Sequence, residues 1–427
     1  MSTWPLRLVH ASDLHLEQPP YGLADVPDHL REMLLEAPYQ AARRVFDTVV
    51  AEEVDFLLLA GDVVNPRMAG PRAITFLADQ FDRLSEAGIA VYWAGGRADL
   101  PQAIRAANQW PTNVHIFSST SVDEFLHERD GQPVASIVGR SRGRSKKIPI
   151  AQLRPERQDL VPVGVAYGSL TRADPEQQHV AYLAVGGRHA HHSSTGTSQR
   201  VACHSGSPQG RCPQETGPHG CTLVEINGTG QPQTQFISTD VLRWSTLSAV
   251  VDSKTSLEML EQQLTECIEK LTAESEEHHQ FVSWNVSGCG PLLRSLRFGQ
   301  SSDPLLHGLR RRFGFQSPAV WSVSVEVDSS TTVLPREWAE QDTILGDFLR
   351  FTEQHLDDPQ LPLDLDSLLR ERYLAGQLGD AIQFQNLPMR ENVLKEAAIL
   401  GADLLGADLL GASLQDVVTT GAATPES

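Results

Sequence analysis

Two segments near the N-terminus place carboxylate and imidazole side chains directly after apolar runs. The first run, Leu6–Ala11, precedes an Asp-x-His triplet that contains Asp13 and His15. The second run, Phe56–Ala60, precedes a Gly-Asp pair that ends at Asp62. Carboxylate and imidazole groups suit Mn, Fe or Zn as ligands. Divalent metals held in this way neutralise the charge of a phosphoester and supply a nucleophile, so the residue types indicate metal-dependent phosphoester hydrolysis.

The elements that must position these side chains alternate along the first third of the chain. Leu6–Ala11, Phe56–Ala60 and Ile89–Ala94 are short apolar runs, typical of strands that are covered on both faces. Tyr39–Glu53 and Pro71–Ala87 lie between them and have the apolar spacing or end signals of helices. This β-α-β-α-β order predicts a layered α/β core.

After residue 112 the apolar runs become shorter. Loops rich in Gly, Ser, Pro and His separate them, above all residues 186–220. Loops at strand ends are where binding and catalytic residues concentrate. The expected strands are Asn113–Phe117, Val122–Arg129, Val134–Val138, Val161–Ala166, Tyr182–Val185 and Cys221–Ile226.

The chain is expected to leave this core near residues 241–246. Thr255–Glu274 reads as a helix with one apolar stripe, and Phe281–Val286 and Val320–Val327 read as strands, which predicts a small α+β unit. Beyond Pro335 the chain is expected to be mostly helical. A five-residue repeat between residues 402 and 414 is too short to form a β-solenoid, so a terminal helix or frayed tail is predicted instead.

Composition and charge disfavour several classes of protein. The chain has 427 residues, 40% of them hydrophobic, and no apolar run approaches the ~20 residues that span a bilayer. Without a signal peptide at its start, a cytoplasmic protein with no membrane association is expected. The formal net charge of −19 disfavours non-specific coating of nucleic acid. Two basic runs, Arg140–Lys147 and Arg310–Arg312, either line a local groove or form a solvated loop and helix end.

The cysteines offer another candidate metal site. Five are too few and too scattered for a disulfide framework. Three of them recur every nine residues near His204 and His219, which leaves a zinc site as an alternative. Because the chain has no Cys-x-x-Cys pair, packing positions are favoured. The five are Cys203, Cys212, Cys221, Cys267 and Cys289.

The two ligand-bearing segments and a third segment together resemble a known family. The third runs through Ser205–Arg211 into Glu215–Gly217 and Gly220–Ile226. In this order and strand context, the three resemble the calcineurin-like metallophosphoesterases. Within that family they are most similar to the DNA-repair exonuclease branch, which includes the SbcD nuclease subunit of bacterial SbcCD. The resemblance covers residues 6–240 well and residues 241–330 loosely.

The resemblance implies a fold and its division into domains. The fold class is α/β, with a four-layer metallophosphoesterase sandwich in residues 1–240. A small α+β capping or accessory domain would occupy residues 241–330. A helical C-terminal region with a flexible tail would occupy residues 331–427.

The resemblance also implies one complete metal site. In the family, the Asp and His of Asp-x-His, the Asp of Gly-Asp and a late His hold one metal, and these correspond to Asp13, His15, Asp62 and His189. A two-residue shift would instead align His189 and His191 with the family's His-x-His motif. The unshifted alignment is preferred because the preceding strand and glycine then fit without a gap.

The family's second set of ligands is largely replaced in this chain. Where the family has Gly-Asn-His-Asp, this chain has Arg97 and Ala98 in place of the Asn and the His. Two further histidines become Tyr167 and Gly187, which leaves the bridging Asp62 alone. One divalent metal, expected to be Mn²⁺, is therefore predicted, with the second site broken.

Two arginines offer a substitute for the missing positive charge. Arg97 beside Asp62 would replace part of that charge and could donate two hydrogen bonds to a phosphate. Arg188 would act in the same way. The alternative is that Arg97 is a surface arginine on a relaxed loop.

Two functions from different classes follow. The first is a metal-dependent phosphoesterase, resembling DNA-repair exonucleases, that hydrolyses phosphodiesters through metal-bound hydroxide. The second is a catalytically impaired relative that holds at most one metal and binds DNA or a partner. The resemblance implies DNA and an SMC-like coiled-coil ATPase as partners, the ATPase docked through the helical C-terminal region, and a homodimer is left open.

Overall fold

The structure, a computed structural model, describes residues 5–143, 148, 150–170, 174–328, 334, 336–363 and 387–405, apart from residues 25, 197, 253, 275–277 and 289. It divides into two compact units. The first comprises Met1–Ser245, Ser275–Phe281 and Ser317–Ala319. The second comprises Thr246–Glu274, Val282–Gln316 and Val320–Ser427. The three-part division at residues 240 and 330 stays a prediction.

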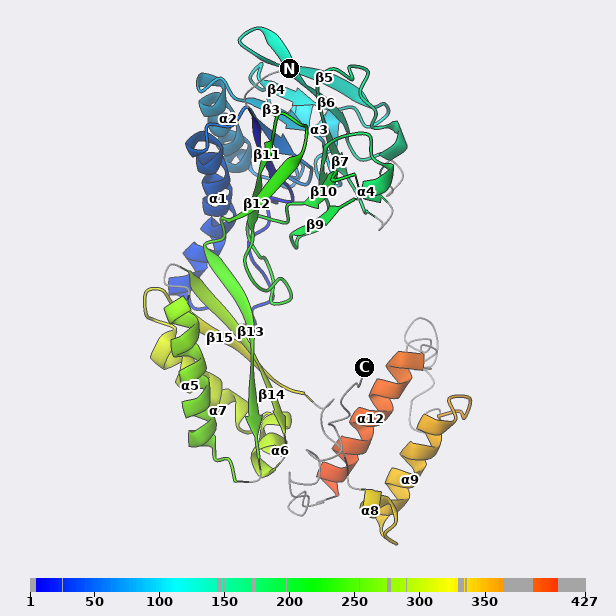
Figure 1. The fold of residues 1–427 in the computed structure, drawn as a ribbon. Coiled ribbons are helices and arrows are strands. Elements are labelled where there is room, and N and C mark those ends of the chain that lie inside the picture. The colour runs from blue at the N-terminus through cyan, green and yellow to red at the C-terminus, as the bar shows by residue number, and fades with distance from the viewer. Residues whose placement is uncertain are drawn as a thin grey trace. The chain divides into compact units, whose positions relative to one another are not determined.

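The first unit contains two six-stranded sheets (Figure 1). The order in the first sheet is β12 (Pro232–Ser238), β11 (Gly220–Ile226), β1 (Leu6–Ala11), β2 (Phe56–Leu59), β3 (Ala90–Trp93) and β4 (Val114–Ile116). Strands β1 to β4 run parallel, whereas β11 pairs antiparallel with β1 and β12 pairs antiparallel with β11. The carboxyl ends of β1, β2 and β3 therefore lie along the same edge.

The second sheet has its own parallel core. Its order is β5 (Asp123–Arg129), β6 (Gln132–Arg140), β7 (Val161–Tyr167), β8 (Tyr182–Gly186), β10 (Val201–His204) and β9 (His192–Thr195). Strands β6, β7, β8 and β10 are parallel, and β5 and β9 close the two edges antiparallel.

Apolar side chains pack these elements into four layers. Helices α1 (Asp28–Ala51), α2 (Pro71–Glu86) and α3 (Pro101–Ala107) cover the outer face of the first sheet. Between the sheets, Phe56 and Tyr92 pack with Val163 and Tyr182, and burying each such side chain stabilises the fold by about 1.5–3 kcal/mol. Beyond the second sheet lie the 3₁₀ turn η1 (Ile150–Gln152) and the single-turn helix α4 (Asp174–Gln177). The predicted layered α/β fold is confirmed.

Helix α1 is longer than predicted. The sequence placed its start at Tyr39, whereas it begins at Asp28 and continues through Pro38. Proline in a helix removes one backbone hydrogen bond, but packing onto the sheet overrides this preference. Leu30 and Leu34 extend the buried stripe of the later turns across the proline.

Buried histidines contribute to the packing between the two sheets. Nδ1 of His10 on β1 lies 2.9 Å from the hydroxyl oxygen of Tyr182. Burial lowers the pKa of His10 well below its ordinary value. His127 on β5 is 7% exposed, and its Nδ1 lies 3.1 Å from the hydroxyl of Tyr92. Burial lowers the pKa of His127 to about 4. Both imidazoles are therefore neutral core groups at neutral pH.

These histidines predict a loss of stability in mild acid. The unfolded chain takes up a proton on His127 near pH 6.5, whereas the folded chain does so only near pH 4, so stability falls as the pH is lowered through this window. Between pH 6.5 and pH 4, the free energy of unfolding should fall less in His127→Gln than in the wild type. The difference between the two proteins should be on the order of 2 kcal/mol. Urea denaturation at several pH values measures this. The exposed His179→Gln should follow the wild type, and equal slopes for all three proteins would contradict the prediction.

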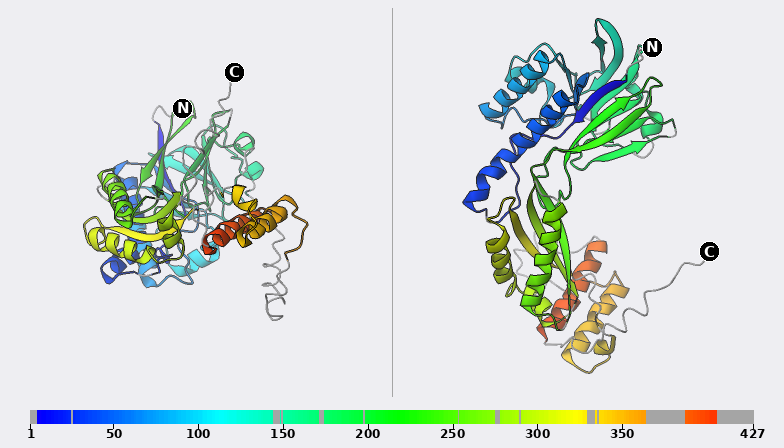
Figure 2. Two further views of the ribbon diagram at one scale, coloured as in Figure 1. Left: turned by 90° about the horizontal axis from the view of Figure 1, so that it is seen from below. Right: turned by 60° about the vertical axis from the view of Figure 1, so that its left-hand side comes forward.

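The second unit is built on a three-stranded sheet with helices packed against it (Figure 2). Its strands are β13 (Leu242–Val251), β14 (His279–Gly288) and β15 (Val320–Val327), and its helices are α5 (Leu257–Glu274), α6 (Pro291–Arg297) and α7 (Ser302–Phe313). The predicted helix and two strands are confirmed. Strand β13 was missed because its outward positions are polar and its apolar run is discontinuous.

The second basic run has a packing role. Arg310 on α7 donates to the carbonyl oxygens of Ser322 and Val323 at 2.7 and 2.9 Å, and its guanidinium lies 4.8 Å from the ring centroid of Trp321. Arg312 lies 3.8 Å from Glu269. Of the first basic run, residues 144–147 lie outside the described residues.

The described part of the C-terminal region is helical, as predicted. It consists of α8 (Arg336–Ala339), α9 (Ile344–Asp357) and α12 (Leu387–Leu404), and α9 packs against α12 through Leu349 and Ala398. The five-residue repeat begins in α12, and the rest of it lies outside the described residues. Across the described helices, none is long and apolar enough to cross a bilayer.

Candidate metal centre

Loops from both sheets of the first unit meet at the carboxyl ends of their strands. Asp13 and His15 follow β1, Asp62 follows β2, and His189 follows β8. The backbone N–H groups of Asp13 and His15 donate to the two carbonyl oxygens of the Gly-Asp pair at 2.9 and 3.0 Å. The N–H of Gly187 donates to the Asp13 carboxylate at 2.9 Å. Three segments far apart in sequence are thereby joined around one point.

Three of the four predicted metal ligands form a cluster. One ligand atom from each of Asp13, His15 and His189 lies within 4.8 Å of the others. The rings of His15 and His189 meet edge to face, with centroids 5.5 Å apart. Both ring nitrogens of His15 are buried and have no hydrogen-bond partner among the described residues. Because a buried imidazole without a partner is costly, this carboxylate and imidazole set fits a divalent metal.

Asp62, the fourth predicted ligand, adjoins this cluster. Its Oδ2 lies 4.0 Å from Nε2 of His15. The same oxygen accepts a hydrogen bond from the hydroxyl of Tyr167 at 2.5 Å, and its Oδ1 accepts one from the N–H of Ala98 at 2.6 Å. Burial, followed by the charge of Asp62, raises the pKa of Tyr167, so the hydroxyl keeps its proton and donates.

Three of these residues have strained backbone conformations. The φ angle is 55° at Asp13, 45° at His15 and 50° at Asp62. Residues other than glycine rarely adopt such angles, which cost about 1–3 kcal/mol each and cluster at functional sites. The surrounding fold therefore holds these three residues in backbone conformations that an unconstrained loop would rarely adopt.

Two carboxylates that the sequence analysis missed lie beside the imidazoles. Oε1 of Glu215 is 2.6 Å from Nδ1 of His189. Although burial opposes its ionisation, hydrogen bonds from His189 and from the backbone of Arg211 lower the pKa of Glu215 to about 2. Oε1 of Glu17 is 3.7 Å from Nδ1 of His15. A carboxylate hydrogen-bonded to Nδ1, as Glu215 is to His189, favours the tautomer with an unprotonated Nε2, which in this structure lies 3.1 Å from Nη2 of Arg211.

Asp99 joins the loops that follow β2 and β3. Its carboxylate accepts hydrogen bonds at 2.6–3.1 Å from the backbone N–H groups of Asp62, Val63 and Gly96 and from the indole of Trp93. Burial, followed by the charge of Asp62, raises the pKa of Asp99 to about 7. The sequence assigned it no role, although it ends the segment that departs most from the family pattern.

The two arginines predicted to act on the substrate lie at the surface of the loops. Arg97 and Arg188 are both exposed. Across the described residues no ion pair joins Arg97 to Asp62, and Tyr167 contacts that carboxylate instead. Burial, followed by the charge of Arg188, lowers the pKa of His204 to about 4. The roles of both arginines stay predictions.

The alternative ligand sets are not assembled. Cys203, Cys212 and Cys221 are buried free thiols. In the part of the chain that is described, Asp13, His15 and His189 are the only group of three or more candidate ligands within reach of one another. His191 packs its ring against Phe236, with centroids 4.9 Å apart.

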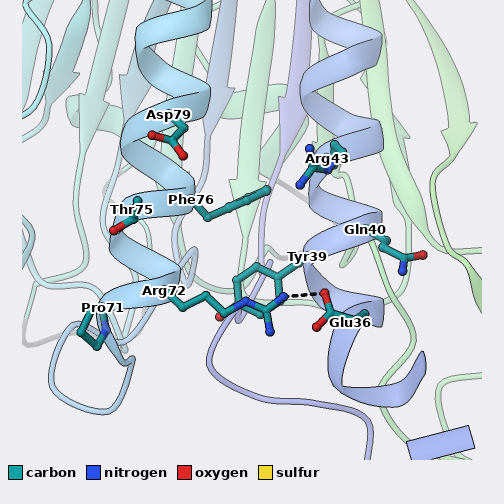
Figure 3. Close-up of a pocket in the computed structure, with 9 residues that line it drawn as sticks. All are labelled: Glu36, Tyr39, Gln40, Arg43, Pro71, Arg72, Thr75, Phe76 and Asp79. Atoms are coloured by element: carbon teal, nitrogen blue, oxygen red, sulfur yellow. Dashed lines mark hydrogen bonds and ion pairs between the residues drawn. The ribbon is translucent and has the colours of Figure 1, made fainter. Parts of the chain in front are cut away.

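A pocket of about 370 Å³ opens elsewhere in the first unit, between α1 and α2 (Figure 3). Arg72 lies over the ring of Tyr39, 4.1 Å from its centroid, and pairs with Glu36 at 2.5 Å. Two of its charged groups, Arg72 and Glu36, thus pair with one another, and none of the candidate ligands lines it. We therefore place the site at the strand ends.

Comparisons with known proteins agree with this geometry. The sequence model of the family described as calcineurin-like phosphoesterase matches residues 6–168, which carry Asp13, His15 and Asp62. A protein of Bacillus subtilis (strain 168), named "Uncharacterized metallophosphoesterase YhaO", is 30% identical over 281 residues. The match covers 62% of this chain and 68% of that relative.

Proposed function

Because this chain belongs to the calcineurin-like metallophosphoesterase family, whose chemistry is metal-dependent phosphoester hydrolysis, we propose that it hydrolyses phosphodiesters with one divalent metal, Mn²⁺. The observation that carries the proposal is the cluster of Asp13, His15 and His189, in which neither ring nitrogen of the buried His15 has a hydrogen-bond partner among the described residues. A metal-binding role accounts for that arrangement.

The residues of this cluster and those around it have different roles in the proposed reaction. When bound, a divalent metal neutralises phosphate charge and lowers the pKa of a water molecule. Asp13, His15 and His189 would hold it, with Asp62 beside them. Glu215, 2.6 Å from His189, fixes the orientation of that imidazole.

Positive side chains near the cluster support phosphate binding. Arg211 is buried and already engaged, because its Nη1 donates to Gln18 and its Nη2 lies within 3.1 Å of both ring nitrogens of His189, so the phosphate-binding cations are other arginines. The guanidinium of Arg142 lies 5.8 Å from the ring centroid of Tyr167. Arg97 and Arg188 extend the positive charge to the surface of the loops. Guanidinium groups bind phosphate oxygens through paired hydrogen bonds, so these residues suit a phosphodiester anion.

We propose linear DNA as the substrate class. The support is the resemblance of the three motif segments to DNA-repair exonucleases, together with Arg140 and Arg142 of the first basic run. A local basic edge is compatible with the net charge of −19, because attraction of a polyanion depends on local potential. An SMC-like ATPase partner and a homodimer stay expectations.

The test is hydrolysis by the purified full-length chain. Bis(p-nitrophenyl) phosphate and linear DNA are supplied with Mn²⁺, and Asp62→Ala is compared with the exposed Asp79→Ala. We expect metal-dependent cleavage of both substrates that is lost in Asp62→Ala and kept in Asp79→Ala. Cleavage that survives unchanged in Asp62→Ala, or no cleavage at all, would overturn the proposal.

A second candidate is a relative that binds DNA or a partner without cleaving. One observation favours it: both oxygens of Asp62 already accept hydrogen bonds, from Tyr167 and Ala98. Under this alternative, labelled linear DNA is retained by the chain without any fragment being produced.

A further inference from the structure

The ring of Tyr167 lies beside Asp62, and its hydroxyl contacts that carboxylate. Tyr167 is the last residue of β7, and its ring lies against three glycines. A Cβ atom added to Gly61, Gly96 or Gly187 would approach ring carbons of Tyr167 to 2.6, 2.7 or 3.1 Å. Contacts that short do not fit, so the three glycines provide a cradle for this ring.

The hydroxyl of Tyr167 anchors the Asp62 carboxylate. It donates to Oδ2 at 2.5 Å, while the N–H of Ala98 donates to Oδ1 at 2.6 Å. Oδ2 also faces His15, whose Nε2 is 4.0 Å away. A carboxylate oxygen has two lone pairs, so Oδ2 can accept the hydroxyl while its other lone pair stays available on the side of the cluster.

Next to Asp62 lies the ring of Tyr167 and, among the described residues, no second set of ligands. The described residues contain one group of three or more candidate ligands, and it lies on the His15 side. A described cation near the ring is a side chain: the guanidinium of Arg142 lies 5.8 Å from its centroid. Positive charge on this side of Asp62 therefore comes from the protein.

We propose that Tyr167 makes this a mononuclear metal site, by filling the space beyond Asp62 and holding the Asp62 carboxylate toward the cluster. The inference rests on the proposed metal-binding function. Tyr167 acts as a positioning residue: its hydroxyl acts on the metal through Asp62. The ring sets the number of metals, and the hydroxyl sets how well Asp62 is oriented.

The test measures metal count and affinity, independently of hydrolysis. The metal-free chain is titrated with Mn²⁺ by calorimetry, and the loaded protein is examined by electron paramagnetic resonance. We expect one ion per chain and the spectrum of isolated Mn²⁺ ions. Tyr167→Phe keeps the ring and removes the hydroxyl, so it should still bind one ion, about tenfold more weakly. Tyr92→Phe removes another buried hydroxyl, which lies beside His127, and should keep the wild-type affinity.

The outcomes separate this inference from the proposed function. Two ions per chain, or an exchange-coupled spectrum, would overturn the mononuclear site while leaving hydrolysis intact. Equal affinities for Tyr167→Phe, Tyr92→Phe and wild type would overturn the positioning role. One bound ion without hydrolysis would uphold the inference and overturn the proposed function, and no binding at all would overturn both.

Discussion

Asp13→Asn is expected to abolish metal-dependent hydrolysis. The substitution keeps the shape of a side chain that is 1% exposed, and its oxygen can still accept the hydrogen bond from Gly187. It removes the negative charge from the cluster with His15 and His189. A metal contributes several kcal/mol to such a reaction and each 1.36 kcal/mol is tenfold, so the rate should fall about 10³-fold. Mn²⁺ affinity should fall roughly 100-fold or more, beyond the usual effect of residues that only orient a ligand.

Hydrolysis of bis(p-nitrophenyl) phosphate and Mn²⁺ calorimetry measure the two effects. Asp79→Asn is the matched control, because Asp79 is an exposed aspartate of α2 in the same unit. It should leave both quantities unchanged. Unaltered Mn²⁺ affinity in a folded Asp13→Asn protein would mean that the metal binds elsewhere, and the cluster would lose its assigned role.

The parts of the site that the sequence predicts are those encoded by short, local patterns. The sequence predicted Asp13, His15 and Asp62 because each closely follows a continuous apolar run. The strand and its ligand are therefore visible within one short segment. His189 was predicted from the resemblance, which aligns it with the late His of the family, and it lies three residues after β8. The structure brings Asp13, His15 and His189 within ligand distance, as those local patterns imply.

The parts that the sequence did not predict depend on contacts between distant segments. Tyr167 meets Asp62 across 105 positions of sequence, and Glu215 meets His189 across 26. Local spacing carries no information about such pairs. Tyr167 read as a lost ligand, and only the structure shows that its ring occupies the space which three glycines leave open. Arg97 illustrates the converse: the resemblance to the family places it near Asp62, but no ion pair joins the two side chains among the described residues, and Tyr167 contacts that carboxylate instead.

The fold likewise has features that local sequence patterns predict and features that depend on tertiary packing. The α/β layers follow from apolar runs and end signals that lie within single elements. The early start of α1 and the strand β13 were missed because each depends on packing that overrides local preference, through Pro38 in one case and a mixed polar and apolar surface in the other.

Asp99→Asn is expected to lower the free energy of unfolding of the first unit by about 3 kcal/mol or more. Each carboxylate oxygen of Asp99 accepts two N–H donors, from Asp62 and Gly96 on Oδ1 and from Val63 and Trp93 on Oδ2. An asparagine can satisfy only one pair, and its NH₂ group would face the other. Each buried donor left without a partner costs about 1–3 kcal/mol.

Urea denaturation followed by tryptophan fluorescence measures the effect, since Trp93 itself donates to Asp99. Asp159→Asn is the control: that carboxylate is exposed and pairs with Arg157, and surface substitutions usually change stability by no more than about 0.5 kcal/mol. If Asp99→Asn were as stable as wild type, the four N–H donors would not depend on this carboxylate, and its role in joining the loops would be wrong. A stability loss confined to Asp99→Asn would show that this carboxylate holds the β2 and β3 loops together around Asp62.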